Sequence, residues 1–301
     1  MILACLTSFA AAPPVPWAAD WEGEGARIAI VGALPDDDHG LAEAVLARDP
    51  DLVVLTGVSA TADLSAWRLG AEHRVVARSV GAPRKAWLKR FDGIGVSGID
   101  KPVPYGAVDA VIGGTRWRIL YLTTWTTPAR TWEEQSYWLP KALDRSSYDR
   151  LLVVTDAPAH TLAEAASPAR GADILLDRVQ ERADPLSFVA MIAGNTDTNE
   201  LFAPGGRFGE VHLVAGSSDG GGAAFARAGG GGLTRRRELE PAFVGALEEQ
   251  GFGPETYTGV SGFWTLELDR GNAVLDFWME REARWEVVYR LVRDKQGWHL
   301  P

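Results

Sequence analysis

The sequence predicts an α/β fold on three observations. Five apolar runs rich in β-branched residues each end in a short loop, at residues 28–31, 52–56, 74–80, 151–155 and 188–193, as buried strands do. Strand-like and helix-like segments alternate over the first third of the chain, which indicates a mostly parallel sheet with right-handed crossovers. The C-terminal third instead alternates apolar and polar residues at period two, which is typical of antiparallel strands.

The first part of the chain predicts three strand–helix units. The expected pairs are strand 27–33 with helix 39–48, strand 52–56 with helix 62–70, and strand 74–80 with a short helical segment near 83–91. The pattern then changes, because residues 106–113 and 115–124 are predicted to form a hairpin around Gly113 and Gly114. Two adjacent glycines accept the positive φ angles that a tight hairpin turn needs.

A helix is expected from Thr131, which forms a capping box with Glu134. Trp138 and Leu139 follow at a spacing that directs them to a sheet. Pro140 has no N–H for the carbonyl four residues earlier, so we expect it to kink or shorten this helix.

The C-terminal half predicts a strand over 208–215 and period-two strands near 262–269, 273–280 and 285–292. Between them, the glycine-rich stretch from Gly216 to Gly232 is expected to be a surface loop. It has no phosphate-binding loop pattern, because no Lys-Ser/Thr pair follows its glycines.

Composition excludes several classes of partner. The chain has 301 residues and a formal net charge of -10, so electrostatic binding to nucleic acid or to an anionic membrane is not expected. Its single cysteine excludes an internal disulfide and a cysteine-based zinc site. The compartment is therefore not fixed by cysteine usage.

Residues 1–25 form an apolar N-terminal segment followed by a proline-containing linker, and the folded domain is expected over 26–301. The segment is typical of a truncated signal peptide, or of a lipoprotein signal with Cys5 as the lipid anchor. Either would make the protein exported, periplasmic or membrane-tethered through Cys5 alone. The alternative is a frayed tail on a cytoplasmic protein.

The five strand ends resemble those of the calcineurin-like metallophosphoesterases, whose loops there read Asp-x-His, Gly-Asp, Gly-Asn-His-Asp/Glu, His and Gly-His-x-His. A Gln-x-x-Trp-Leu helix before the fourth motif also matches, at Gln135, Trp138 and Leu139. The resemblance covers about residues 27–294. It implies a four-layer αββα sandwich of two mixed β-sheets flanked by helices.

The motif residues themselves are replaced. By the resemblance, the family's metal and phosphate ligands fall on Ala33, Pro35, Val58, Ala82, Pro83, Arg84, Asp156, Asn195 and Asp197. Two-metal hydrolysis needs a carboxylate that bridges the cations, and Val58 occupies the place of that carboxylate. We therefore expect no catalytic residues, no cofactor and no dinuclear centre. The expected role is a noncatalytic binding or scaffold domain, with a protein or small molecule at the old active-site cleft.

In an alternative interpretation, the protein retains a metal-binding site. An acidic remnant offers oxygen ligands for one Ca²⁺ or Mg²⁺, and a divergent metal-dependent phosphoesterase would use it as a single-metal site. Its members are Asp36, Asp38, His39, Asp156, Asn195 and Asp197. The competing interpretation is that these side chains cap helices or lie in solvent, as Asp38 directly before a helix indicates.

Overall fold

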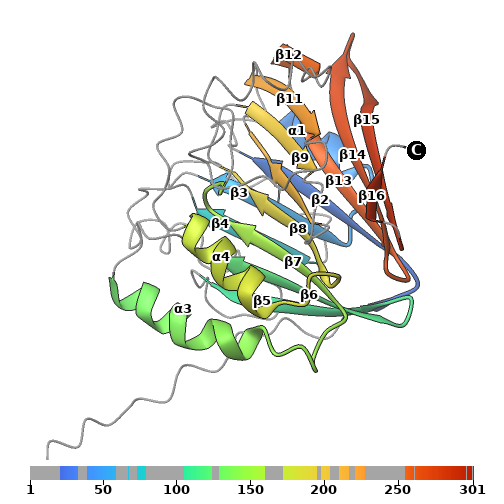
Figure 1. Ribbon diagram of the computed structural model, residues 1–301. Helices are drawn as coiled ribbons and strands as arrows, with labels where there is room; N and C mark the ends of the chain where they lie inside the picture. The colour runs from blue at the N-terminus through green and yellow to red at the C-terminus, as the bar shows by residue number, and fades with distance from the viewer. Residues whose placement is uncertain are drawn as a thin grey trace, which may run out of the picture.

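Two β-sheets pack face to face in this protein, with helices on both outer faces (Figure 1). The computed structural model describes residues 21–32, 39–58, 67, 73–78, 105–123, 129–159, 172–194, 198–203, 210–216, 221–227, 255–260, 262–295, 297–299 and 301. This arrangement confirms the predicted αββα sandwich.

The first sheet has seven strands in the order β16-β15-β14-β13-β2-β3-β4. Its parallel part is β2 (Ala26–Gly32), β3 (Leu52–Val58) and β4 (His73–Arg78). Its antiparallel part is β13 (Gly262–Asp269), β14 (Asn272–Arg281), β15 (Arg284–Asp294) and β16 (Gly297–His299). The period-two pattern of the C-terminal third therefore predicted the correct pairing.

The second sheet has nine strands in the order β1-β5-β6-β7-β8-β10-β9-β11-β12. Their bounds are β1 (Trp21–Gly23), β5 (Gly106–Ile112), β6 (Thr115–Leu122), β7 (Arg150–Thr155), β8 (Phe188–Ala193), β9 (Thr198–Ala203), β10 (Val211–Val214), β11 (Gly221–Arg227) and β12 (Glu255–Val260). β1 lies in the segment expected to be a linker and pairs in parallel with β5. The hairpin of β5 and β6 turns at Gly113 and Gly114, whose φ angles are 56° and 79°.

One stretch predicted as loop contains a strand. β11 lies inside the glycine-rich stretch and pairs in parallel with β9 and antiparallel with β12. The prediction was wrong because hydrogen bonding to a strand on each side outweighs the low intrinsic strand propensity of these glycines.

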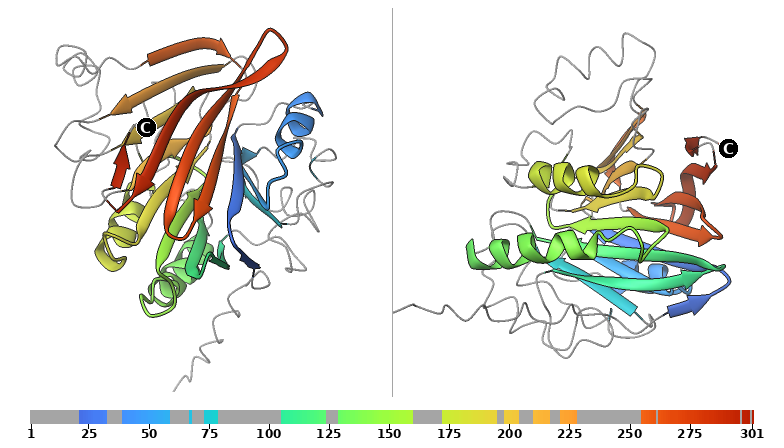
Figure 2. Two further views of the ribbon diagram at one scale, coloured as in Figure 1. Left: turned by 90° about the vertical axis from the view of Figure 1, so that its right-hand side faces the viewer. Right: turned by 60° about the horizontal axis from the view of Figure 1, so that its bottom comes forward.

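Among the described residues, helix α1 (His39–Leu46) covers the seven-stranded sheet, and α3 (Ala129–Ala142) and α4 (Ala172–Arg182) cover the nine-stranded sheet (Figure 2). α3 begins two residues before Thr131, so Thr131 is not its cap. It also continues past Pro140, so the expected shortening is wrong. Leu139 and Ala142 on either side of this proline are buried, and their packing holds the last turn in place.

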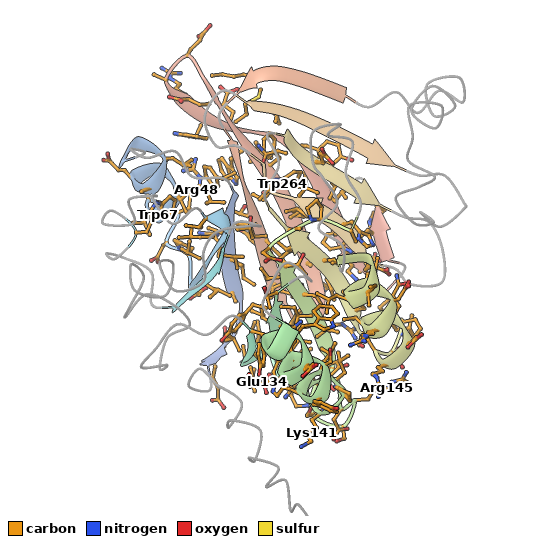
Figure 3. The ribbon with its side chains drawn as sticks, turned by 90° about the vertical axis from the view of Figure 1, so that its left-hand side faces the viewer. Arg48, Trp67, Glu134, Lys141, Arg145 and Trp264 are labelled. Atoms are coloured by element: carbon orange, nitrogen blue, oxygen red, sulfur yellow. The ribbon has the colours of Figure 1, made fainter. Side chains whose placement is uncertain are left out.

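Three apolar clusters fill the layers. One lies between the sheets and includes Trp264 of β13 (Figure 3). A second lies under α3 and α4, and a third lies under α1. In the part of the chain that the structure describes, no helix is long and apolar enough to cross a membrane.

Candidate functional site

The carboxyl ends of strands from both sheets meet at one edge of the sandwich. Thr56 Oγ1, near the end of β3, lies 3.4 Å from the carbonyl oxygens of Val31 in β2 and Ala193 in β8. Its single hydroxyl hydrogen serves one of them at a time. The loops that follow these strands therefore start close together, where ligands bind in open α/β sheets.

Glycines make this close approach possible. A Cβ atom built on Gly194 would lie 2.4 Å from Thr56 Oγ1 and 2.7 Å from the backbone nitrogen of Gly57. A Cβ on Gly32 would lie 1.8 Å from the carbonyl oxygen of Ala215. The two backbones are in direct contact at both points, so no side chain fits there.

Val58 ends β3 at the place where the resemblance puts the bridging carboxylate. It follows Gly57, which has a φ of 65°, and its side chain is fully buried. It belongs to the apolar cluster under α1, together with Val45 and Trp67. Figure 3 shows Trp67 beside α1, on the outer side of the seven-stranded sheet. The side chain of Val58 is thus part of the core on the outer side of this sheet.

Asp156 directly follows β7 and is 1% exposed. Its Oδ2 accepts a hydrogen bond from Thr123 Oγ1 at 3.3 Å. Gln135 of α3 holds Thr123 at the backbone, because Gln135 Oε1 accepts from Thr123 N at 2.8 Å and Gln135 Nε2 donates to Thr123 O at 2.9 Å. This network fixes Thr123, the residue directly after β6, beside the Asp156 carboxylate.

Asn199 of β9 is a polar residue at this edge that sequence reasoning missed. It is 1% exposed, and its Oδ1 accepts from Gly216 N at 3.1 Å and from Trp264 Nε1 at 3.3 Å. The amide therefore connects both sheets. Glu200 beside it is fully buried. A signal was available, since Asn199 and Glu200 closely follow Asn195 and Asp197 of the fifth motif.

Most of the predicted remnant cannot be compared with the structure. Its members Asp36, Asp38, Asn195 and Asp197 lie outside the described residues, as do the other motif positions Ala33, Pro35, Ala82, Pro83 and Arg84. His39 begins α1, and only its backbone is described. The proposed convergence of the remnant stays a prediction.

The described side chains at this edge offer limited chemistry. They supply the carboxylates of Asp156 and Glu200, the amide of Asn199 and the hydroxyls of Thr56 and Thr123, all buried. Within the described ranges, no three His, Cys, Asp or Glu side chains are grouped so that they could hold a metal ion. Hydrogen bonds of these groups join strand ends and α3 to one another.

Two cavities lined by described residues lie away from this edge. One of about 490 Å³ lies at the opposite end of the sandwich, beside Arg27, Asp51 and Glu267. The other, of about 510 Å³, lies between α3 and α4, where the Arg178 guanidinium is 5.5 Å from the Trp132 ring centre. Both are surface hollows outside the strand-end edge.

Comparisons with known proteins identify the fold. No family model and no curated protein matches the sequence. Among solved structures, the chain is similar to PhoD, with a TM-score of 0.55 and 11% identity over 92% of this chain and 71% of that one. It is also similar to the purple acid phosphatase PPD1 from yellow lupin (Lupinus luteus) seeds, with a TM-score of 0.52 and 12% identity over 91% of this chain. The chain spans 55% of the lupin protein's length.

A third similar structure is a dimetal phosphatase from Danio rerio, with a TM-score of 0.45 and 13% identity over 88% of this chain and 98% of that one. The expectation of no cofactor, or at most weakly bound Ca²⁺ or Mg²⁺, is contradicted by the likeness to PhoD and to the purple acid phosphatase PPD1. It failed because it equated the loss of motif residues with the loss of a site, whereas in open α/β sheets any loop that follows a strand end can supply ligands. The chain has the metallophosphoesterase-type fold.

Proposed function

We propose that this chain has lost phosphoester hydrolysis and acts as a noncatalytic binding domain, with its ligand or partner protein at the strand-end edge. The observation that carries the proposal is the environment of Val58. A bridging carboxylate must face the cations, whereas the side chain here packs under α1 with Val45 and Trp67. A carboxylate at this position would be buried without a partner, which is strongly unfavourable.

The close contact of the sheets also supports a binding role. Gly32 against Ala215, and Gly194 against Thr56, fix the positions from which the loops start. The network of Gln135, Thr123 and Asp156 is buried and hydrogen-bonded. A rigid floor of this kind positions loops for recognition and requires no reactive group.

The test is a hydrolysis assay on the purified chain with Zn²⁺, Mn²⁺, Mg²⁺ and Ca²⁺ in turn, using p-nitrophenyl phosphate and bis(p-nitrophenyl) phosphate. We expect the same background rate for the unmodified chain and for Asp156→Asn with every cation. The variant is the matched control, because a contaminating phosphatase would act equally in both preparations. Metal-dependent turnover that Asp156→Asn abolishes would overturn the proposal and favour a divergent hydrolase.

A further inference from the structure

Two arginines come together at the end of the sandwich opposite the strand-end edge. Arg150 is the first residue of β7, and Arg293 is the penultimate residue of β15. Both touch the turn between β13 and β14. Arg293 Nη1 donates to the carbonyl oxygen of Gly271 at 3.4 Å, and a Cβ on Gly271 would lie 3.2 Å from Arg150 Nη2.

The hydrogen-bonding capacity of this pair is only partly used. Arg293 Nη2 donates to the carbonyl oxygen of Leu186 at 3.0 Å, and Arg150 Nη1 donates to that of Asp149 at 3.1 Å. The Nε atom of each arginine is buried and has no hydrogen-bond partner. A buried N–H without a partner carries the full cost of its desolvation.

The carboxylates nearby, Asp149 and Asp294, compensate the charge of the pair only in part. Asp149 is bound by Arg116, whose Nη2 lies 2.9 Å from Asp149 Oδ1. Arg293 is only 5% exposed, and burial followed by the charge of Arg150 lowers the pKa of Arg293 to about 10, against the opposing effect of Asp294. Arg293 is still protonated at neutral pH, so two positive charges share this site.

We propose that Arg150 and Arg293 bind a small tetrahedral oxyanion, phosphate or sulfate, at the base of the sandwich. A dianion matches their two charges, and its oxygens can accept from the guanidinium of half-buried Arg150 while its charge offsets that of Arg293. Guanidinium groups are well suited to such anions because their N–H donors lie in one plane as a fork. Arg150 is half-buried, which leaves an approach from solvent, and the missing side chain at Gly271 keeps the Arg150 fork uncovered.

This site is independent of the proposed binding function. Its residues come from β7, β15 and the β13–β14 turn, and therefore from both sheets. A bound anion would add a link between the two sheets at this end, where Gly271 already lies against Arg150. The expected effect is a more stable sandwich in phosphate or sulfate.

The experiment measures the thermal unfolding midpoint of the purified full chain in a buffer free of both anions, and then with phosphate, sulfate or chloride at matched ionic strength. At ten times the dissociation constant of phosphate, we expect a rise of about 2 °C. Sulfate should act similarly and chloride should have a much smaller effect. Equal effects of all three salts would mean general screening and would overturn the proposal.

Three variants locate the site. Arg150→Gln and Arg293→Met should each remove the rise in phosphate, whereas Arg116→Gln, the matched control, should keep it, because Arg116 is exposed and bound to Asp149. If Arg293→Met does not fold, Arg150→Gln decides the question, since Arg150 is less buried. Direct binding is followed by the line width of the ³¹P signal of inorganic phosphate. A broadened signal that Arg150→Gln leaves unchanged would contradict the assignment.

Discussion

Val58 is the single residue whose surroundings bear most directly on function. Its side chain is fully buried beside Trp67 and Val45. A valine side chain cannot coordinate a metal ion. Because this side chain also packs in the core under α1, an acidic residue substituted here would not coordinate a metal ion either.

We therefore expect Val58→Asp to destabilise the protein by about 3 kcal/mol or more, because it buries an unpaired carboxylate. Val58→Thr has nearly the same shape and is the control, with an expected loss of about 1–2 kcal/mol. Urea unfolding gives both free energies. If Val58→Asp proved as stable as Val58→Thr and hydrolysed a phosphoester, the assignment of this position to the core would be wrong.

Gly194 allows a second residue-level prediction. A Cβ atom on this residue would lie 2.4 Å from Thr56 Oγ1, so Gly194→Ala forces the two sheets apart locally and should cost about 1–3 kcal/mol. Gly40→Ala is the opposite control, since nothing lies within 4 Å of a Cβ there. It is in helix α1 and should stabilise the protein by about 0.5–1 kcal/mol. Both are measured by chemical denaturation, and equal effects would argue against contact at Gly194.

At the level of elements, Gln135 connects α3 to the end of β6. Its two hydrogen bonds to the Thr123 backbone are fully buried. Without the amide, the N–H and the carbonyl of Thr123 would each lose a buried hydrogen bond. The end of β6 would then lose this connection to α3.

Gln135→Leu should accordingly lower the free energy of unfolding by about 2–3 kcal/mol, because it removes two buried hydrogen bonds to the Thr123 backbone. Tyr137→Ala, two positions along the same helix and 77% exposed before substitution, should change it by less than about 0.5 kcal/mol. Amide hydrogen exchange at Thr123 offers a local readout. Unchanged protection there in Gln135→Leu would contradict the role of this side chain.

The start of β7 carries an acid-sensitive contact. Hydrogen bonds from the Arg116 side chain, above all, lower the pKa of the Asp149 carboxyl. A carboxyl whose pKa is lower in the folded protein stabilises it fully above the unfolded pKa, which is about 3.9, and less as pH falls through the folded value.

The difference in unfolding midpoint between the unmodified chain and Asp149→Asn should therefore be constant above about pH 5 and shrink as pH falls below about 4. Both residues of the pair are substantially exposed, so the difference should be small and should decrease in salt. Thermal scans between pH 7 and pH 2 measure it. A difference that grew on acidification would show that the carboxylate does not stabilise the folded state.

For the whole molecule, local patterns predicted the fold well. Strands such as β2, β7 and β8 are continuous apolar runs, and such runs predict burial on both faces of a sheet. The prediction failed where long-range contacts outweighed local propensity, as at Pro140 in α3 and in the glycine-rich strand β11. Helix α4 was also missed.

The candidate site was less predictable than the fold. The sequence indicated which strand ends meet and that Asp156 lies among them. It did not indicate the direction of the Val58 side chain, the amide contacts of Gln135, or the bond from Asn199 to Trp264, which joins residues 65 positions apart. Such contacts depend on how two sheets are placed relative to each other, which no local pattern encodes.

The contact at the strand-end edge has a consequence for the order of folding. Thr56 and Ala193 are 137 positions apart, so their contact closes a very long loop and is expected to form after the local hairpins. Interactions absent from the folding transition state mainly govern the unfolding rate. Gly194→Ala should therefore accelerate unfolding in stopped-flow experiments and leave the refolding rate nearly unchanged, which makes this edge the part of the protein that sets its lifetime in the native state.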